Sequence, residues 1–146
     1  VVNFEKAFGR TAKREREGAW FRACDVFVSS ELSSTDDKAR IKLASGGVGN
    51  PEFQKVIAKH ALGRRRSNTR GVDMVELLAA THHAYAYAVV LDWEGFTDTN
   101  GKGLPYSPEF MIQVFEQYPR AFDDVRTFAE DLRNFAIEAE AEAAKN

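Results

Sequence analysis

Few residues in this 146-residue chain have the types and spacing that support metal binding or catalysis. His82 and His83 are adjacent, so on a helix their side chains point about 100° apart and do not converge on one metal ion. His60 has no ligand partner at metal-binding spacing, and Cys24 is the only cysteine. The sequence therefore predicts no metal site. It also predicts no catalytic site and no enzymatic activity, because no nucleophile stands in a recognised motif.

One stretch resembles a calcium-binding loop in its spacing. Four residues occupy the first, third, sixth and twelfth positions of such a loop: Asp98, Asn100, Gly103 and Glu109. The fifth position is Lys102, whose ammonium group stands where an oxygen ligand is needed. We therefore expect a plain turn that leads into a helix cap.

Two segments carry residue types that contact phosphate groups. The glycine-rich run 46–49 lacks the Lys-Ser/Thr pair that reaches phosphate and metal in a phosphate-binding loop, so it predicts a loop before a helix. A basic run provides a candidate electrostatic contact through Arg64, Arg65, Arg66 and Arg70. No helix-turn-helix or zinc-finger pattern accompanies this run, so we favour a solvated connector or an acidic protein partner over nucleic acid.

The formal net charge is −2, yet the charges are unevenly distributed. Residues 1–70 contain 15 Lys and Arg against 8 Asp and Glu, whereas residues 71–146 contain 5 against 14. Such an asymmetry is typical of a protein that assembles with partners or with further copies of itself. The hydrophobic content of 44% and the single cysteine predict a soluble domain in a reducing compartment, without membrane contact or a secretory signal.

Three segments are expected along the chain. Residues 1–17 form a flexible basic and acidic arm or a frayed helix, residues 18–137 form the compact domain, and residues 138–146 form a frayed acidic tail. The domain is expected to be α+β, mainly α-helical with a helical C-terminal half. Its strand component is a small N-terminal β-hairpin made by residues 18–21 and 39–43.

Helix-start signals divide the rest of the domain, because Asn or Ser before Pro is typical of the first turn of a helix. Four helices are expected: from Asn50-Pro51 to Gly63, from about 73 to about 90, from Ser107-Pro108, and from Pro119 towards Ala144. The alternation of residue types from Tyr85 to Val89 leaves a strand open as the alternative within the second helix.

The last expected helix carries a wide apolar face. Its large members are Phe122, Phe128, Leu132 and Phe135. Two interpretations remain open for this face. It either binds a partner or packs against the rest of the domain as core.

One segment resembles a known family. An apolar helix ends in a Trp-x-Gly element, an acidic turn with Asn-Gly follows, and Leu-Pro-Tyr-Ser-Pro-Glu then opens a helix. The residues that carry this pattern are Trp93, Gly95, Phe96, Asn100, Gly101, Leu104, Pro105, Ser107, Pro108 and Glu109. The segment is similar to the tail assembly chaperones of long-tailed bacteriophages and their prophage relatives. Physically we expect a structural clasp, with Trp93 as a core anchor rather than a ligand contact.

The resemblance implies a non-enzymatic function without cofactor or small-molecule substrate. Such a chaperone binds and solubilises the tape measure protein, helps to recruit tail tube subunits, and acts in the host bacterial cytoplasm before it leaves the particle. It can also associate with itself. The alternatives are a structural tail or head–tail component retained in the virion, or a nucleic-acid-binding module that uses the Arg64–Arg70 run.

Overall fold

The computed structural model describes residues 3–32, 38–66 and 74–136. Its elements follow in the order α1 (Phe4–Glu17), β1 (Ala19–Arg22), α2 (Ala23–Val26), β2 (Arg40–Leu43), α3 (Pro51–Arg66), α4 (Met74–Ala84), the π-helix η1 (Tyr85–Val89), β3 (Val90–Glu94), α5 (Pro108–Gln117), α6 (Pro119–Glu130) and the 3₁₀-helix η2 (Leu132–Phe135). The chain is mainly helical with a small antiparallel sheet, as the sequence predicts.

The sheet has three strands in the order β1-β2-β3, and both pairings are antiparallel. In the central strand β2, Ile41 and Leu43 are fully buried, whereas Arg40 is exposed. This alternation between apolar and basic residues is the pattern of a strand with one face on the core. The predicted hairpin of β1 and β2 is therefore confirmed.

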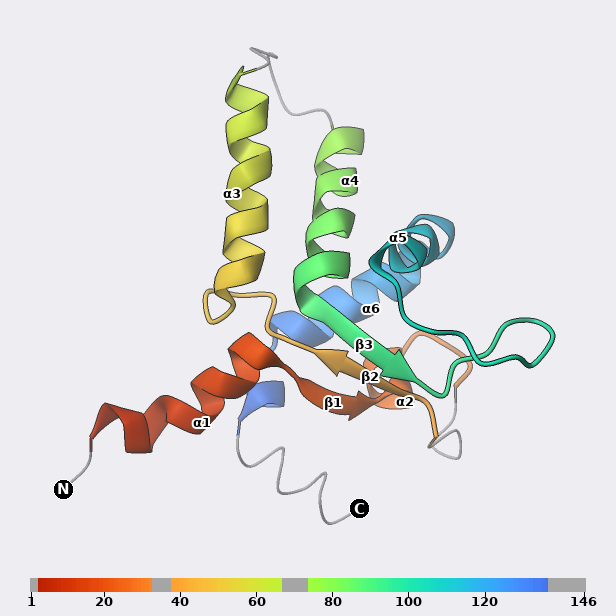
Figure 1. Ribbon diagram of the computed structural model, residues 1–146, viewed down its shortest axis with the longest axis horizontal. Coiled ribbons are helices and arrows are strands. Elements are labelled where there is room, and N and C mark those ends of the chain that lie inside the picture. Colours follow the sequence, from red (N-terminus) through yellow and green to blue (C-terminus); the bar gives the residue numbers. More distant parts are fainter. Residues whose placement is uncertain (1–2, 33–37, 67–73, 137–146) are drawn as a thin grey trace.

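The third strand was not anticipated by the sequence analysis. The helical segment predicted for residues 73–90 is confirmed as α4 followed by η1, and the chain then turns directly into β3. On β3, Val90 pairs with Leu43 and Trp93 pairs with Ile41. Helix α3 stands beside α4 above the sheet, and α6 passes behind the sheet in the view of Figure 1.

Two predicted helix ends were wrong. Helix α3 continues past Gly63 to Arg66, because a helix tolerates one glycine at a cost of about 1 kcal/mol. Helix α6 ends at Glu130 rather than running towards Ala144. Asp131 adopts an extended backbone, and its carboxylate accepts hydrogen bonds from the backbone N–H and the side chain of Arg133. Local bonds of this kind compete with helix continuation.

Aromatic rings form the centre of the core where α3, η1, α5 and α6 meet. The ring of Tyr85 packs edge-on against Phe53 and Phe122, at centroid distances of 5.2 and 5.3 Å. Phe115 contacts Phe122 at 5.1 Å, also edge-to-face. These rings come from distant parts of the sequence, so their packing holds the helices to one another.

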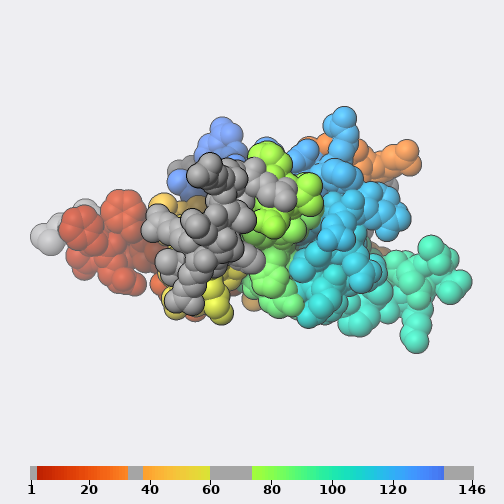
Figure 2. Space-filling view, turned by 90° about the horizontal axis from the view of Figure 1, so that it is seen from above, coloured from red at the N-terminus to blue at the C-terminus, as the bar shows by residue number. Residues whose placement is uncertain are grey.

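Helix α1 occupies the segment predicted as an arm or frayed helix. Asn3 caps its start by accepting a hydrogen bond from the Lys6 N–H at 2.7 Å, yet none of its residues is buried. Its C-terminal end is held by two hydrogen bonds, from Arg14 Nε to the Phe135 carbonyl and from the Ser45 N–H to the Glu15 carbonyl. The rest of α1 projects from one end of the molecule (Figures 1 and 2). The predicted acidic tail, residues 138–146, lies outside the described residues.

Candidate functional site

The segment with the family-like pattern folds around Trp93. This side chain is only 8% exposed. Its ring lies 5.2 Å from Phe96, 5.0 Å from Tyr106 and 5.8 Å from Phe110, measured between centroids. Its indole N–H donates a hydrogen bond of 2.8 Å to the Leu104 carbonyl. Trp93 is therefore the anchor of a clasp that joins β3 to the start of α5, as the sequence predicts.

A tight turn closes the outer end of this clasp. The Asp98 N–H donates to the Lys102 carbonyl at 2.9 Å, and Asp98 Oδ1 accepts from the N–H groups of Asn100 and Lys102. Gly101 has a φ of 80°, which favours glycine. The carboxylate that would begin a calcium loop thus stabilises the predicted turn.

Gly95 brings the clasp against the loop before β2. Its φ is 82°, and a Cβ at this position would collide with the Lys38 carbonyl and the Ala39 backbone. Only glycine fits this close approach. Farther along, Pro105 has a fixed φ and stands between Leu104, whose carbonyl accepts from Trp93, and the partly buried Tyr106.

Helix α5 begins as the sequence predicts. The Ser107 side chain accepts a hydrogen bond from the Phe110 N–H at 3.1 Å, and Pro108 occupies the first turn. Glu109 accepts a hydrogen bond of 2.8 Å from the Tyr87 hydroxyl. Its own backbone N–H and this hydroxyl lower the pKa of the Glu109 carboxyl, and the same hydrogen bond raises the pKa of Tyr87.

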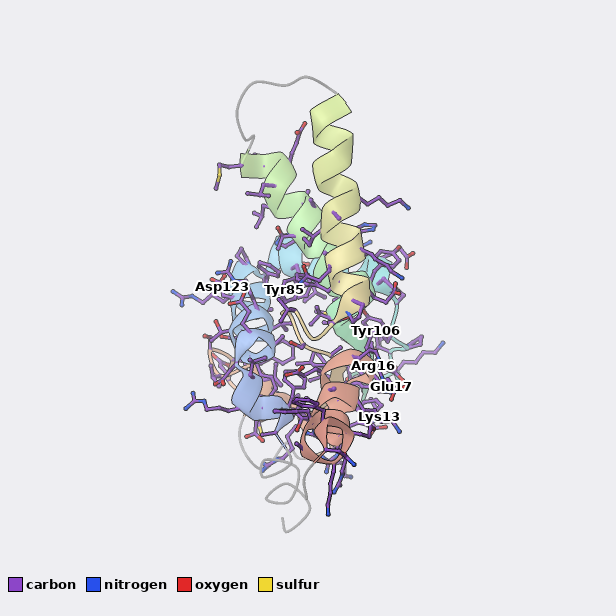
Figure 3. All side chains as sticks on the ribbon, turned by 90° about the vertical axis from the view of Figure 1, so that its left-hand side faces the viewer. Lys13, Arg16, Glu17, Tyr85, Tyr106 and Asp123 are labelled. Carbon is purple, nitrogen blue, oxygen red and sulfur yellow. The ribbon has the colours of Figure 1, made fainter. Side chains whose placement is uncertain are left out.

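Tyr106 connects the clasp to the π-helix. Its hydroxyl lies 2.5 Å from the Ala86 carbonyl and 2.9 Å from the Val90 carbonyl, at the end where η1 gives way to β3. A π-helix leaves backbone carbonyls displaced from the α-helical pattern. The single phenol O–H of Tyr106 lies within reach of one of them, the Ala86 carbonyl, and of the Val90 carbonyl at the start of β3. Burial, with smaller contributions from Asp92 and Glu109, raises the pKa of Tyr106. Tyr85 is fully buried and Tyr106 is partly buried against the core, and both are labelled in Figure 3.

The other residues considered for chemistry have structural surroundings. His82 is buried against Phe115 and Phe122, and this burial lowers its pKa despite the opposing charge of Glu116. His83 is exposed and stacks on Tyr87. Across residues 3–32, 38–66 and 74–136, no group of three His, Cys, Asp or Glu side chains is placed to hold a metal ion.

The glycine-rich run 46–49 and its neighbours form a loop that hydrogen-bonds to two other elements. Asn50 is buried, and its side-chain amide donates to the Ser45 and Ala88 carbonyls at 2.9 and 2.8 Å. The Gly46 N–H donates to the Ala129 carbonyl. These bonds join the loop to η1 and α6, so the run is a structural junction before α3.

The four residues of the predicted partner face lie mostly in the core. Phe122 and Phe135 are buried, and Phe128 is partly buried against Phe21 at a centroid distance of 4.7 Å. Leu132 is 53% exposed. Among the four, Leu132 alone offers most of its side chain to a partner. Of the basic run, Arg64, Arg65 and Arg66 belong to the last turn of α3, with side chains that are not described, and Arg70 lies outside the described residues.

The sequence analysis missed two exposed apolar surfaces. Four apolar residues at the start of α4 are largely solvent-exposed: Met74, Val75, Leu77 and Leu78. On α1, Phe4 and Phe8 are exposed and stack on each other. The sequence contained a signal for the exposed surface on α4. Its apolar residues occupy more than one face of the helix, whereas packing against the domain covers only one face. Such surfaces are typical of interaction sites.

Comparison with known proteins identifies the class of this protein as prophage-encoded. The model of the YdaY prophage protein family matches residues 48–146, and the chain belongs to this family. The matched region includes α3, α4 and the whole clasp, whereas α1, β1 and β2 precede it. No curated protein and no solved structure matches the chain. Within the described residues, none of the helices combines the length and apolar character needed to cross a membrane.

Proposed function

We propose that this prophage protein is a non-enzymatic tail assembly chaperone. It binds and solubilises the tape measure protein and helps to recruit tail tube subunits while the tail is built in the host cytoplasm. It then leaves the particle. The observation that carries this proposal is the segment from Trp93 to Glu109, because its sequence pattern resembles that of tail assembly chaperones and lies within the region matched by a prophage family.

The surface of the protein supports a binding function. Apolar side chains project from α1 and the start of α4, and Leu132 is exposed on η2. Soluble monomers rarely display several such surfaces unless they bind other proteins. An aggregation-prone apolar helix, such as a tape measure protein would present, can be masked by contacts of this kind.

Co-expression with the tape measure protein from the same prophage tests the proposal. Pull-down and size-exclusion light scattering should show the tape measure protein soluble and bound to several copies of this chain. A tape measure protein from an unrelated prophage is the specificity control. If the cognate tape measure protein stays insoluble while this chain remains folded and alone, the proposal is wrong.

A substitution pair tests the predicted contact. Leu132→Ser should weaken capture of the tape measure protein, whereas Val48→Ser, an equally apolar exposed change in a loop, should not. If both variants capture it equally, the contact lies elsewhere on the chain. Mass spectrometry of purified virions tests the departure step, and abundant protein there would instead favour a retained structural component.

A further inference from the structure

Helix α1 carries a stripe of cations on the side that meets the end of the described chain. Lys6, Arg10 and Arg14 recur every four residues, so they line one side of the helix at intervals of about 6 Å. Arg14 Nε donates a hydrogen bond of 3.0 Å to the Phe135 carbonyl, which places this side against η2, the short blue turn beside α1 in Figure 1. Lys6 and Arg10 continue the stripe along the projecting part of α1, and both are exposed.

The glutamates of α1 lie off this stripe. Glu5 stands nine residues before Arg14, so the two side chains lie about 180° apart around the helix. Glu15 is directed at the loop before α3, and the Glu17 carboxylate lies 3.9 Å from the Lys13 ammonium. The stripe therefore concentrates positive charge on one side of a helix that has no buried residue. A helix of 14 residues with so little packing is marginal in water and gains from any further contact along its length.

The sequence continues from the end of this stripe with acidic residues. Ala136 leaves η2 in an extended conformation, and residues 137–146, which lie outside the described residues, follow it. Their sequence includes Glu138, Glu140 and Glu142, separated by single alanines. In an extended chain alternate side chains share one face, so these three carboxylates would recur on one face at intervals of about 6.6 Å. The spacing of the acidic residues thus matches the spacing of the cations on α1.

The point of attachment sets the direction and reach of the acidic segment. It begins next to Phe135, whose carbonyl accepts the hydrogen bond from Arg14 at the inner end of the stripe. Arg14 and Lys6 are about 12 Å apart along the helix axis, whereas an extended chain advances about 3.3 Å per residue. Residues 137–142 therefore reach Lys6 of their own chain when they run antiparallel to α1. A short tether gives an effective concentration on the order of millimolar, which favours this contact over one with a second copy.

We propose that residues 137–142 form a strap that docks along α1 of the same chain and holds this helix against the domain. The facing residues are Glu138, Glu140 and Glu142 on the strap and Lys6, Arg10 and Arg14 on α1. Phe4 and Phe8 each stand two residues from Lys6, about 160° away around the helix, so the strap leaves both rings exposed. The segment predicted as a frayed tail thus acquires a structural role. This inference goes beyond the proposed chaperone function and does not depend on it.

Amide hydrogen exchange of the full chain tests the strap. A variant that keeps its length but loses its charges carries Glu138→Gln, Glu140→Gln and Glu142→Gln. We expect the α1 amides of this variant to exchange several-fold faster than those of the wild type. In about 1 M NaCl, where the Debye length falls to about 3 Å, the two proteins should exchange alike because the charges are screened. Unchanged exchange in α5 and α6 checks that the domain is folded.

A control variant removes three negative charges from exposed positions on α3, β3 and α6. It carries Glu52→Gln, Glu94→Gln and Asp123→Asn. Because these residues lie outside the strap, the control should protect α1 as the wild type does. If the strap variant exchanges like the wild type at low salt, or if the control loses protection to the same extent, the inference is overturned.

Exchanging the charges between the two stripes provides the sharper test. Lys6→Glu/Arg10→Glu reverses the outer part of the α1 stripe and leaves the hydrogen bond of Arg14 in place. This double variant should lose the protection of α1, and so should a chain in which the three strap glutamates are lysines. Combining both sets of changes should restore protection, because opposite charges face each other again. A combined variant that exchanges no more slowly than its two parents would contradict direct pairing.

Cross-linking locates the contact and shows whether it lies within one chain. In a Cys24→Ser background, Ala7→Cys stands beside the stripe and Glu142→Cys stands on the strap. Under mild oxidation in dilute solution these two cysteines should form a disulfide within one chain. Phe8→Cys with Glu142→Cys is the control pair on the far side of α1 and should remain unlinked. Absence of the first disulfide, equal linkage of the control pair, or linkage mainly between different chains would overturn the inference.

Discussion

The clasp around Trp93 and the helix α1 use aromatic residues in opposite ways. In the clasp, the ring of Trp93 is buried and that of Tyr106 is partly buried, and each carries a polar atom that hydrogen-bonds to backbone carbonyls. On α1, Phe4 and Phe8 contact each other and face solvent. Aromatic content therefore does not by itself identify the core. The polar bonds that fix the clasp rings distinguish this packed region from the solvent-exposed rings of α1.

Replacing Trp93 should give the largest loss of stability. Trp93→Ala removes a buried ring and its hydrogen bond to Leu104, and we expect the free energy of unfolding to fall by about 3–5 kcal/mol. Trp20 on the edge strand β1 is half-exposed, and Trp20→Ala should cost about 1 kcal/mol or less. Urea denaturation followed by circular dichroism measures both. Equal losses would contradict the anchoring role of Trp93.

Replacing the two glycines with positive φ in the clasp segment should lower the stability by different amounts. Gly101→Ala places a Cβ in open space and should cost about 1 kcal/mol for the left-handed conformation alone. Gly95→Ala adds a collision with the backbone before β2, so its cost should exceed about 2 kcal/mol. Urea midpoints of the two variants test this order. A larger loss for Gly101→Ala would show that the close approach at Gly95 is relieved easily.

Acid should destabilise the buried core through His82. Burial lowers the pKa of His82 below its ordinary value of 6.5, so the unfolded chain binds this proton more readily than the folded chain. The stability linked to the neutral ring is therefore present above pH 6.5 and is lost as the pH falls through 6.5 towards the folded pKa.

Matched glutamine variants test this linkage. His82→Gln should flatten the dependence of the unfolding free energy on pH in the range below pH 6.5, whereas His83→Gln, at the exposed neighbour, should leave it unchanged. Denaturation curves at a series of pH values measure both. An identical slope for the two variants would assign the acid sensitivity to other groups.

The exposed hydrogen bond between Tyr87 and Glu109 should contribute little to stability, but its loss should change a pKa that NMR can measure. Tyr87→Phe removes the hydroxyl that lowers the pKa of Glu109, so that pKa should rise. A carbon-detected NMR titration of the Glu109 carboxyl measures the change, and the Glu116 carboxyl is an internal control. An unchanged Glu109 pKa would mean that the hydrogen bond from its own backbone N–H accounts for the lowered value.

The smallest effect on stability is expected on α1. At a dilution where single chains predominate, Phe8→Ser should change the free energy of unfolding by no more than about 0.5 kcal/mol, because the ring has little to lose on exposure. Urea denaturation at low protein concentration tests this expectation. A loss comparable to that of Trp93→Ala would place Phe8 in the folding core and remove the contrast between the regions.

Local signals were sufficient to predict the parts of the fold that depend on neighbouring residues. The caps at Asn50 and Ser107 and the turn at Asp98 are short-range arrangements, and the structure confirms them. The alternation of apolar and basic residues in β2 likewise predicted a strand with one buried face, and the structure has it. Errors arose at two helix ends. Helix α3 tolerates Gly63 and continues to Arg66, and the local bonds of Asp131 with Arg133 end α6 at Glu130.

The sequence by itself determined that this protein is a mainly helical domain with a small sheet and a clasp anchored by Trp93, because the residues that specify these features lie close together along the chain. Tertiary structure alone decided that Phe122 and Phe135 are core while Phe4 and Met74 are exposed. An apolar residue carries the same signal in either place. Whether it is covered depends on which distant elements fold against it, and no neighbouring residue encodes that.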